Sequence, residues 1–220
     1  MALQRRRRPD GDKTRDQIIE AAGELFAQYG YQGTTSKAIC QSCGVNLASV
    51  NYHFGSRQGL YEVILKQVHE SLMGLEHLEA LIDSKLAPEQ KFRTFISELI
   101  PAIVGAKNWQ LRIWAREIAA PSEFLPNVMN EQILPKFTRL SALISQLTGL
   151  SADDPRLLPS VFNVISPCLM MLIANREQQM PLSDIFNYPS EQLVDYLQRF
   201  LLAGLKALAD SNSGGWGATA

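Results

Sequence analysis

Two cysteines in the first quarter of the chain have the spacing of a metal-binding or redox pair. Cys40 and Cys43 stand three positions apart, and the only other cysteine, Cys168, lies far along the sequence. A structural zinc site needs four ligands, so the set is incomplete even with His53 as a third ligand. The alternative is burial, because a thiol packs like a small hydrophobe. We favour that packing role and predict neither a metal site nor a cofactor.

Three side chains with hydrogen-bonding groups follow one another a few residues later: Asn51, Tyr52 and His53. If residues 46–54 form a helix that buries Val50, these three side chains point outward. Asparagine can pair with adenine through two hydrogen bonds, and a tyrosine hydroxyl or an imidazole can reach phosphate oxygens. The pattern favours a helix that lies in a DNA major groove, although a solvated amphipathic helix explains any one of the three residues as well.

The elements that would position this surface match a helix-turn-helix. The motif needs a small residue facing the partner helix, a glycine four positions later, and an apolar residue six positions beyond, and Cys40, Gly44 and Val50 meet these conditions. Two helices that cross steeply over a tight turn leave no room for a large side chain, and the turn requires a positive φ. Residues 36–55 are therefore predicted to form the motif.

DNA contacts are predicted on both sides of the turn. The free amides at the start of the first helix, next to Thr35, form a ready phosphate site, and Arg57 can add a charge-assisted bond. Short side chains such as Ala48 let the second helix approach the groove closely. The predicted DNA-binding residues are Thr34, Thr35, Lys37, Asn46, Leu47, Ala48, Ser49, Asn51, Tyr52, His53 and Arg57.

The charge distribution also points to a polyanion at one end of the chain. Residues 1–66 carry nine Lys/Arg and six Asp/Glu, a net +3, whereas residues 67–220 carry twelve and sixteen, a net −4. Residues 1–12, which include Arg5–Arg8, are predicted to be a flexible basic arm. Such an arm adds attraction to phosphates or enters a minor groove, and a solvated tail without a role is equally compatible.

Helical periodicity continues through the rest of the chain, and no alternating strand pattern occurs, so the predicted fold class is all-α. Pro135 and Pro167 fall inside two helical segments and predict a kink or a break at each. The expected helices span about residues 14–29, 34–43, 46–54, 56–74, 76–84, 88–106, 108–119, 124–148, 154–177 and 189–209.

Bulk properties exclude several classes of protein. Of the 220 residues 46% are hydrophobic, but no apolar run reaches the roughly 18 residues of a membrane span, and no apolar signal segment opens the chain. Three cysteines argue against a disulfide framework, so we expect a cytoplasmic protein with no membrane partner. No Ser/His/Asp arrangement, phosphate-binding glycine loop or HExxH pattern is present, so we do not expect an enzyme. A helical scaffold that binds a protein partner, without sequence-specific DNA binding, is the alternative function.

Residues 14–60 resemble the DNA-binding domain of TetR-family transcriptional regulators. The segments that carry the resemblance are TRDQIIEAAGELFAQYGYQGTTSKAI, CGVNLASV and NYHFGSRQGLY. Asn51 stands where the family more often has a tyrosine, and Arg57 replaces the usual lysine, and both side chains can still contact DNA. Residues 116–126, REIAAPSEFLP, are similar to the RE-x-x-x-P element of the CecR-like C-terminal domain.

The resemblance implies an N-terminal helix-turn-helix domain joined to a helical C-terminal domain that dimerises and binds a small-molecule effector. It implies a repressor that binds a palindromic double-stranded DNA operator as a homodimer and is released by its effector. The expected domains are the arm 1–12, the DNA-binding domain 13–60, the effector-binding and dimerisation domain 61–210, and a disordered tail 211–220.

Two sets of residues in the C-terminal domain are candidates for these roles. Arginines next to an indole can hold a planar or anionic ligand, but they equally form structural salt bridges, for example with Glu117 or Glu123. The candidate effector residues are Trp109, Arg112, Arg116, Phe124 and Met170. Apolar stripes on the last two helices suit either a dimer interface or an ordinary core. The candidate dimer residues are Phe162, Ser166, Met170, Ile173, Leu193, Tyr196, Leu197, Phe200 and Leu201.

Overall fold

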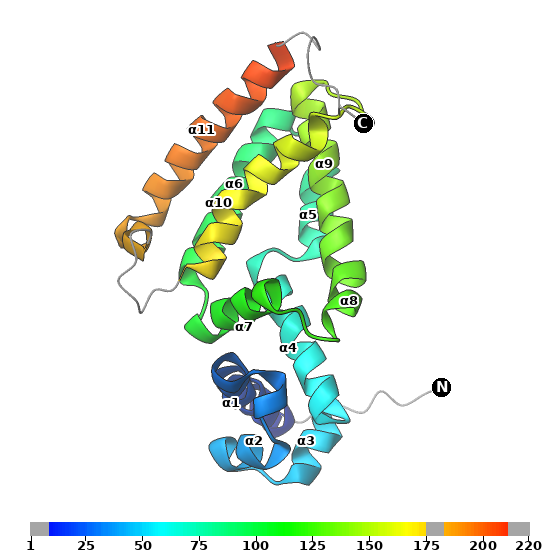
Figure 1. The fold of residues 1–220 in the computed structure, drawn as a ribbon, viewed down its shortest axis with the longest axis vertical. Coiled ribbons are helices and arrows are strands. Elements are labelled where there is room, and N and C mark those ends of the chain that lie inside the picture. Colours follow the sequence, from blue (N-terminus) through cyan, green and yellow to red (C-terminus); the bar gives the residue numbers. More distant parts are fainter. Residues whose placement is uncertain (1–8, 175–182, 211–220) are drawn as a thin grey trace. The chain divides into compact units, whose positions relative to one another are not determined.

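The computed structural model describes residues 9–174 and 183–210, and every long regular element within them is a helix (Figure 1). The predicted all-α fold class is confirmed. The Arg5–Arg8 run, the end of the helix expected over 154–177, and the tail 211–220 lie outside the described residues.

The elements follow the predicted order with small shifts at their ends. They are α1 (Pro9–Gly33), α2 (Ser36–Cys43), α3 (Leu47–Phe54), α4 (Arg57–Leu72), α5 (Leu75–Ile82), α6 (Pro88–Gly105), α7 (Asn108–Ala119), α8 (Leu125–Val128), the π-helical turn η1 (Met129–Ile133), α9 (Leu134–Thr148), α10 (Leu157–Ile173), the 3-10 turn η2 (Ser183–Asn187) and α11 (Ser190–Asp210).

Prolines account for most of the differences from the expected helices. The segment expected as one helix over 124–148 is divided by η1, and Pro135 lies in the first turn of α9, where its missing N–H costs nothing. Of the kink or break expected at Pro167, the break does not occur, because helix α10 continues through this residue. Helix α1 begins at Pro9, so residues 9–12 are helical and do not belong to a flexible arm.

The chain divides into two compact units. Unit 1 contains residues 1–68 and 107–125, and unit 2 contains residues 69–106 and 126–220. This grouping differs from a boundary at residue 60, because α7 returns to pack along α1. Helix α7 therefore belongs to the same unit as the helix-turn-helix.

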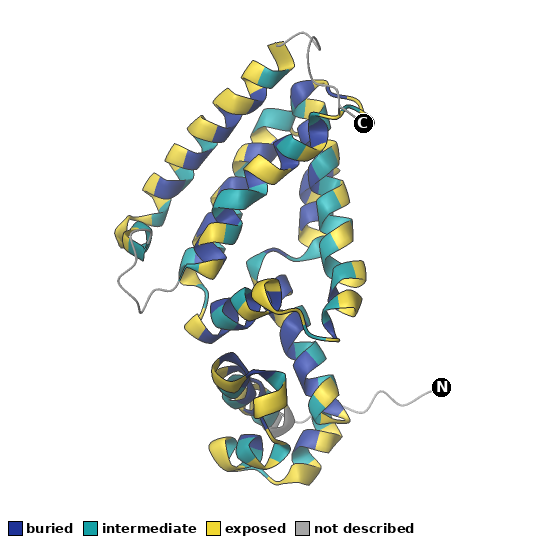
Figure 2. Ribbon diagram, viewed as in Figure 1, coloured by how far each residue is buried: buried dark blue, intermediate teal, exposed yellow. Residues whose placement is uncertain are grey.

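The core of unit 1 is built from buried apolar side chains, and Figure 2 colours the buried positions dark blue. Ile18 and Phe26 of α1, Ile39 of α2 and Val50 of α3 are fully buried. Close approach of α7 depends on Gly23, because a Cβ at that position would lie 2.7 Å from ring carbons of Trp109. The indole of Trp109 thus occupies the space that a side chain on α1 would take.

Unit 2 is built on α6, which packs against α5, α9, α10 and α11. Leu193, Leu197 and Leu201 of α11 are buried in this core, so these three predicted dimer residues are occupied within the chain itself. Their spacing of four residues is that of any core-facing helix stripe, which is why periodicity alone does not separate the two roles. Tyr196 and Phe200, on another side of α11, remain exposed.

Candidate nucleic-acid interface

Side-chain caps and one glycine set the geometry of the helix-turn-helix. The Thr35 hydroxyl accepts a bond from the Ala38 amide at 3.1 Å and begins α2. Gly44 ends α2 with a φ of 67°, a conformation that costs a glycine little. Asn46 Oδ1 then accepts from the Ser49 amide at 2.9 Å and begins α3. The turn predicted from the spacing is therefore built as expected.

Helix α3 has one buried face and one exposed face. Val50 and Phe54 are buried, whereas Leu47, Ala48 and Asn51 are exposed. Tyr52 has 83% of its surface exposed, and its ring meets the half-buried His53 ring edge-on at a centroid distance of 5.0 Å. The exposed face thus offers an amide, a phenol and an imidazole side by side, which are groups that can bond base edges and phosphates.

Other predicted residues take part in forming the helices. Ser49 Oγ also donates to Asn46 Oδ1, at 3.1 Å, so this oxygen is already used twice in starting α3. Lys37 is exposed on α2, and Thr35, although exposed, uses its hydroxyl in the cap. Thr35 and Asn46 therefore fix the starts of α2 and α3, the two helices of the candidate interface.

Thr34 and Arg57, both predicted as DNA contacts, bond to backbone groups inside unit 1. Thr34 is 1% exposed, and its hydroxyl bonds the carbonyl oxygens of Gly30 at 2.8 Å and Leu25 at 3.1 Å. The Arg57 guanidinium lies 4.1 Å from the Tyr31 ring centroid and donates to the carbonyl oxygens of Tyr31 and Thr34. Both side chains fix the segment that leads into α2.

The cysteine pair has no metal partner set within the described residues. No group of three or more His, Cys, Asp or Glu side chains in that part of the chain is arranged to hold a metal ion. Cys40 and Cys43 are half-buried, and the Cys43 thiol donates to the Ile39 carbonyl at 3.1 Å. Burial raises the pKa of Cys43, which keeps the thiol protonated. This is the geometry of a packing residue.

A buried polar network in unit 1 was missed by sequence reasoning. The Tyr61 hydroxyl donates to Glu117 Oε1 at 2.6 Å, and the backbone amide and hydroxyl of Ser122 donate to Oε2 at 3.1 and 2.9 Å. Burial raises the pKa of Tyr61 far above its usual range, and the bond to Glu117 adds to the effect. The segment REIAAPSEF carried the signal, since it contains both Glu117 and Ser122.

The structure does not bring the five candidate effector residues together. Trp109 Nε1 donates to Glu20 at 3.0 Å, and Arg112 pairs with Glu24 at 2.9 Å, so both side chains hold α7 on α1. Arg116 and Phe124 line a cleft of about 520 Å³ within unit 1. Met170 belongs to α10 of unit 2 and is exposed. The salt-bridge alternative holds for Arg112, with a partner on α1 that the sequence did not indicate.

The fold and this surface define a helix-turn-helix DNA-binding protein. Residues 18–64 match the family of bacterial regulatory proteins, tetR family. Residues 88–208, more than half of the chain, match the C-terminal domain of the HTH-type transcriptional dual regulator CecR. The chain therefore belongs to the TetR family of transcriptional regulators, and its C-terminal domain is of the CecR type.

Individual relatives agree with this assignment. The HTH-type transcriptional dual regulator CecR of Shigella flexneri is 27% identical over 161 residues, which cover 67% of this chain and 70% of that protein. The biofilm operon icaADBC negative transcriptional regulator IcaR of Staphylococcus aureus (strain Newman) is 42% identical over 117 residues, 53% of this chain and 60% of its own. In fold, the chain is similar to the transcriptional regulator FadR from Bacillus subtilis, whose crystal structure contains stearoyl-CoA. The TM-score is 0.62 at 17% identity, over 86% of this chain and 98% of that chain.

These matches confirm two predictions. The resemblance to the TetR family is confirmed, and because the matched families and relatives are transcriptional regulators, so is the expectation that the chain is not an enzyme. Within residues 9–174 and 183–210, no helix combines the length and the apolar character that crossing a membrane requires.

Proposed function

We propose that this regulator binds a palindromic DNA operator as a homodimer in the cytoplasm and represses transcription until a small-molecule effector releases it. The observation that carries the proposal is the exposed polar face of α3, where Asn51, Tyr52 and His53 project from a helix whose opposite face is buried. Because α3 is capped at its start and ended by a glycine, this face is held ready before DNA binds.

The residues we assign to DNA contact follow from their positions. Asn51 and Tyr52 are suited to base edges and phosphates, with His53 beside them, and Leu47 and Ala48 give an apolar approach near the start of α3. Polar groups at the starts of α2 and α3 are suited to the phosphate backbone. These are the exposed Thr35, Lys37 and Asn46 and the half-buried Ser49.

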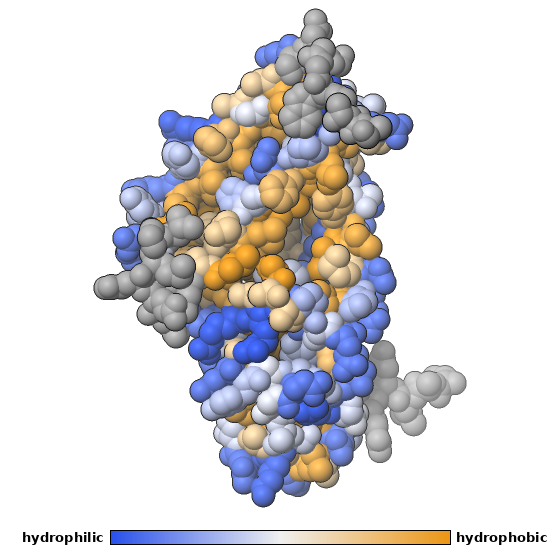
Figure 3. All heavy atoms as spheres, in the orientation of Figure 1, coloured by the Kyte–Doolittle hydropathy of each residue, from blue (hydrophilic) through white to orange (hydrophobic). Residues whose placement is uncertain are grey.

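Exposed apolar side chains in unit 2 support the homodimer. On α10, Phe162 is 64% exposed and Met170 and Ile173 are also exposed, with the half-buried Ser166 between them. On α11, the Tyr196 and Phe200 rings stack with centroids 6.2 Å apart, and both are exposed. Apolar side chains also gather over α10 on the face of unit 2 seen in Figure 3. A second copy can cover such stripes, and two recognition helices about 34 Å apart then read a palindrome.

Repression and effector release are supported by relatives. IcaR is named a negative regulator, and the FadR crystal structure holds stearoyl-CoA. CecR is named a dual regulator, so the names of the relatives include both negative and dual control. For this chain we propose repression. If the effector prefers the conformation of the dimer that does not fit the operator, it weakens DNA binding. By linkage, DNA then weakens effector binding by the same factor.

Selection of bound sequences from random duplex DNA tests the proposal. We expect the selected sequences to share a palindrome of two half-sites whose centres lie about one helical turn apart. On that operator, the double substitution Asn51→Ala and Tyr52→Ala should reduce affinity by about tenfold or more, since each specific base contact contributes about 1–3 kcal/mol. Fluorescence anisotropy with labelled operator measures the affinity.

A matched pair in unit 2 supplies the control. Tyr188 and Gln192 are exposed, and replacing both with alanine removes a phenol and an amide without touching α3. Operator affinity should be unchanged in this control. A helical scaffold without sequence preference would instead return random sequences from the selection, and an enriched single half-site would contradict the homodimer.

A further inference from the structure

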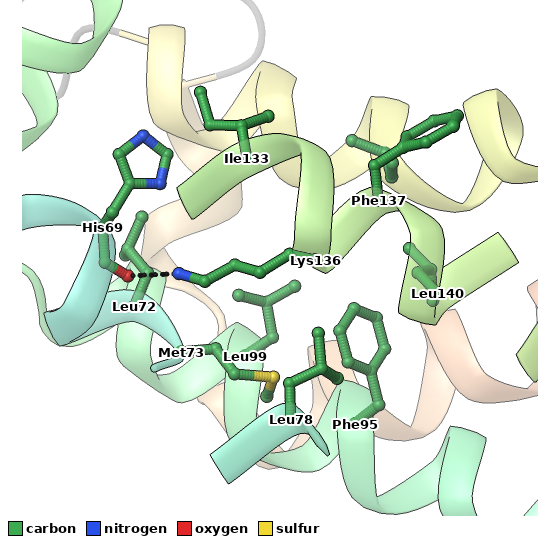
Figure 4. A pocket seen from close by; sticks show the side chains of 11 residues that line it. His69, Leu72, Met73, Leu78, Phe95, Leu99, Ile133, Lys136, Phe137 and Leu140 are labelled. Carbon is green, nitrogen blue, oxygen red and sulfur yellow. Dashed lines mark hydrogen bonds between the residues drawn. The ribbon is translucent and has the colours of Figure 1, made fainter. Parts of the chain in front are cut away.

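Unit 2 contains an apolar cavity that none of the predicted effector residues lines. Its volume is about 180 Å³, and it is bordered by nine apolar side chains together with His69 and Lys136 (Figure 4). Phe95 and Leu99 of α6 and Leu140 of α9 are among these apolar side chains. An apolar pocket of roughly this size can take up a compact apolar molecule. Empty space of this kind is a place where a ligand can fit.

The ammonium group of Lys136, a residue that lines the cavity, lies at the C-terminal end of α4. The Lys136 amine donates to the His69 carbonyl oxygen at 3.1 Å. The same carbonyl accepts the Met73 amide only at 3.4 Å, because α4 ends at Leu72. The last carbonyl groups of a helix lack partners within it and carry partial negative charge, so the ammonium group stabilises this end of α4.

Burial makes this arrangement costly for the ammonium group. It lowers the pKa of Lys136, and the Glu70 carboxylate only partly opposes that effect. Burial, followed by the charge of Lys136, lowers the pKa of His69 to about 4, so the imidazole is neutral at pH 7. The half-buried Lys136 ammonium group lies among the neutral His69 ring and nine apolar side chains. An anionic group on a ligand would stabilise this ammonium group by a charge-assisted hydrogen bond.

We propose that the cavity binds a compact apolar molecule with a single carboxylate, and that this carboxylate draws Lys136 away from the His69 carbonyl. The inference deepens the proposed function, because it names the chemical class of the effector and the contact it changes. The apolar lining selects a hydrophobic body. Among the lining residues that the structure describes, Lys136 is the only cationic side chain. A neutral hydrophobe would fill the space without competing for Lys136.

The exchange has a direct consequence for α4. Without the ammonium group, the His69 carbonyl loses the Lys136 bond beside its long bond from the Met73 amide, and the last turn of the helix frays. Helix α4 begins at Arg57, whose guanidinium holds the segment that leads into α2. The effector therefore acts on one end of the helix whose other end is fixed beside the DNA-reading elements.

Three probes with one chain and different head groups test the ligand class. Octanoate, octan-1-ol and octylamine are titrated into the full-length protein by isothermal calorimetry. Octanoate should bind about tenfold more tightly than octan-1-ol, and octylamine should bind most weakly, because its ammonium group faces Lys136. Equal affinities for the three probes, or no binding of octanoate, would overturn the proposal.

The variant Lys136→Met tests the contribution of the Lys136 charge separately from that of the cavity volume. The variant should bind octanoate no better than octan-1-ol and should retain octan-1-ol binding, which also shows that the cavity still folds. Lys85→Met, a change at an exposed lysine outside the lining, should keep the tenfold preference. A preference that survives in Lys136→Met would contradict the assigned role.

Hydrogen exchange reports on the end of α4. Octanoate should speed exchange of the amides of Leu72 and Met73 in the wild-type protein, and Lys136→Met should show the faster exchange without ligand. Unchanged exchange with bound octanoate would overturn the uncapping step. The calorimetry and exchange measurements need no DNA, so a negative result in them would not contradict operator recognition. Random sequences from the DNA selection would overturn the proposed function but would not contradict octanoate binding.

Discussion

Polar groups inside unit 1 are bonded to one another, whereas the buried His69 and the half-buried Lys136 of unit 2 border an apolar cavity. In unit 1, the carboxyl group of Glu117 joins Tyr61 to Ser122, and Gly23 lets the Trp109 indole lie directly on α1. In unit 2, the polar groups of His69 and Lys136 stand among nine apolar side chains around empty space. The difference suits two tasks, since reading DNA requires fixed geometry and accepting a ligand requires room.

The exposed surfaces differ in the same way. Unit 1 presents Asn51, Tyr52 and His53 on α3, which are side chains that form directional bonds. Unit 2 presents Phe162 and Phe200, which gain from being covered and have little directional preference. Specific recognition of a sequence and association with a second copy are therefore assigned to different surfaces.

The largest expected effect comes from breaking the polar network of unit 1. Glu117→Ala leaves the buried Tyr61 hydroxyl and two partly buried donors of Ser122 without their acceptor, so the free energy of unfolding should fall by about 3–5 kcal/mol. Glu117→Gln retains one acceptor oxygen and should lose only about 1–2 kcal/mol. Urea denaturation measures both, and equal small losses would show that the network does not hold unit 1 together.

A smaller loss should follow from filling the contact between α1 and α7. In Gly23→Ala, the new Cβ meets the Trp109 ring at 2.7 Å, and this overpacking should lower the free energy of unfolding by about 1–3 kcal/mol. Gly105→Ala in unit 2 is the control, because no atom lies within 4 Å of its new Cβ. If the two variants have the same melting temperature, unit 1 is less tightly packed than we describe.

The smallest effect concerns pH and unit 2. The folded-state pKa of His69, about 4, lies below its unfolded value of 6.5, so the unfolded chain binds the proton first as pH falls. The associated stability is complete above pH 6.5 and is lost progressively towards pH 4. Between pH 7 and pH 5 the loss should be about 1–2 kcal/mol. His69→Gln should show a correspondingly weaker pH dependence in urea denaturation, and parallel curves for the two proteins would contradict this.

Local spacing predicted the helix-turn-helix because its determinants are local. Thr35, Gly44 and Asn46 act on backbone groups within a few residues of themselves, so their roles can be read directly from the sequence. The outward direction of Asn51 and Tyr52 followed from the same periodicity. The assignment of this surface to DNA stays a prediction until it is measured.

Partners distant in sequence were not predictable in this way. Tyr61 and Glu117 are 56 residues apart, and Lys136 and His69 are 67 apart, so only the fold brings them together. Arg57 shows the reverse problem, since a basic residue next to a DNA-reading helix suggested a phosphate contact and the fold uses it internally. The cavity left no trace in the sequence, because apolar side chains that border a void follow the same pattern as those that fill a core.

The π-helical turn Met129–Ile133 sets the phase between α8 and α9, the helix that contributes Lys136 to the cavity lining. Two turns of a regular α-helix contain about seven residues, so an uninterrupted helix would align the buried Val128 with Pro135. A π turn inserts one extra residue without adding a turn, and Lys136 takes that alignment instead. A one-residue deletion within 129–133 would restore the regular phase, so an irregularity of the backbone sets the direction of Lys136 relative to Val128.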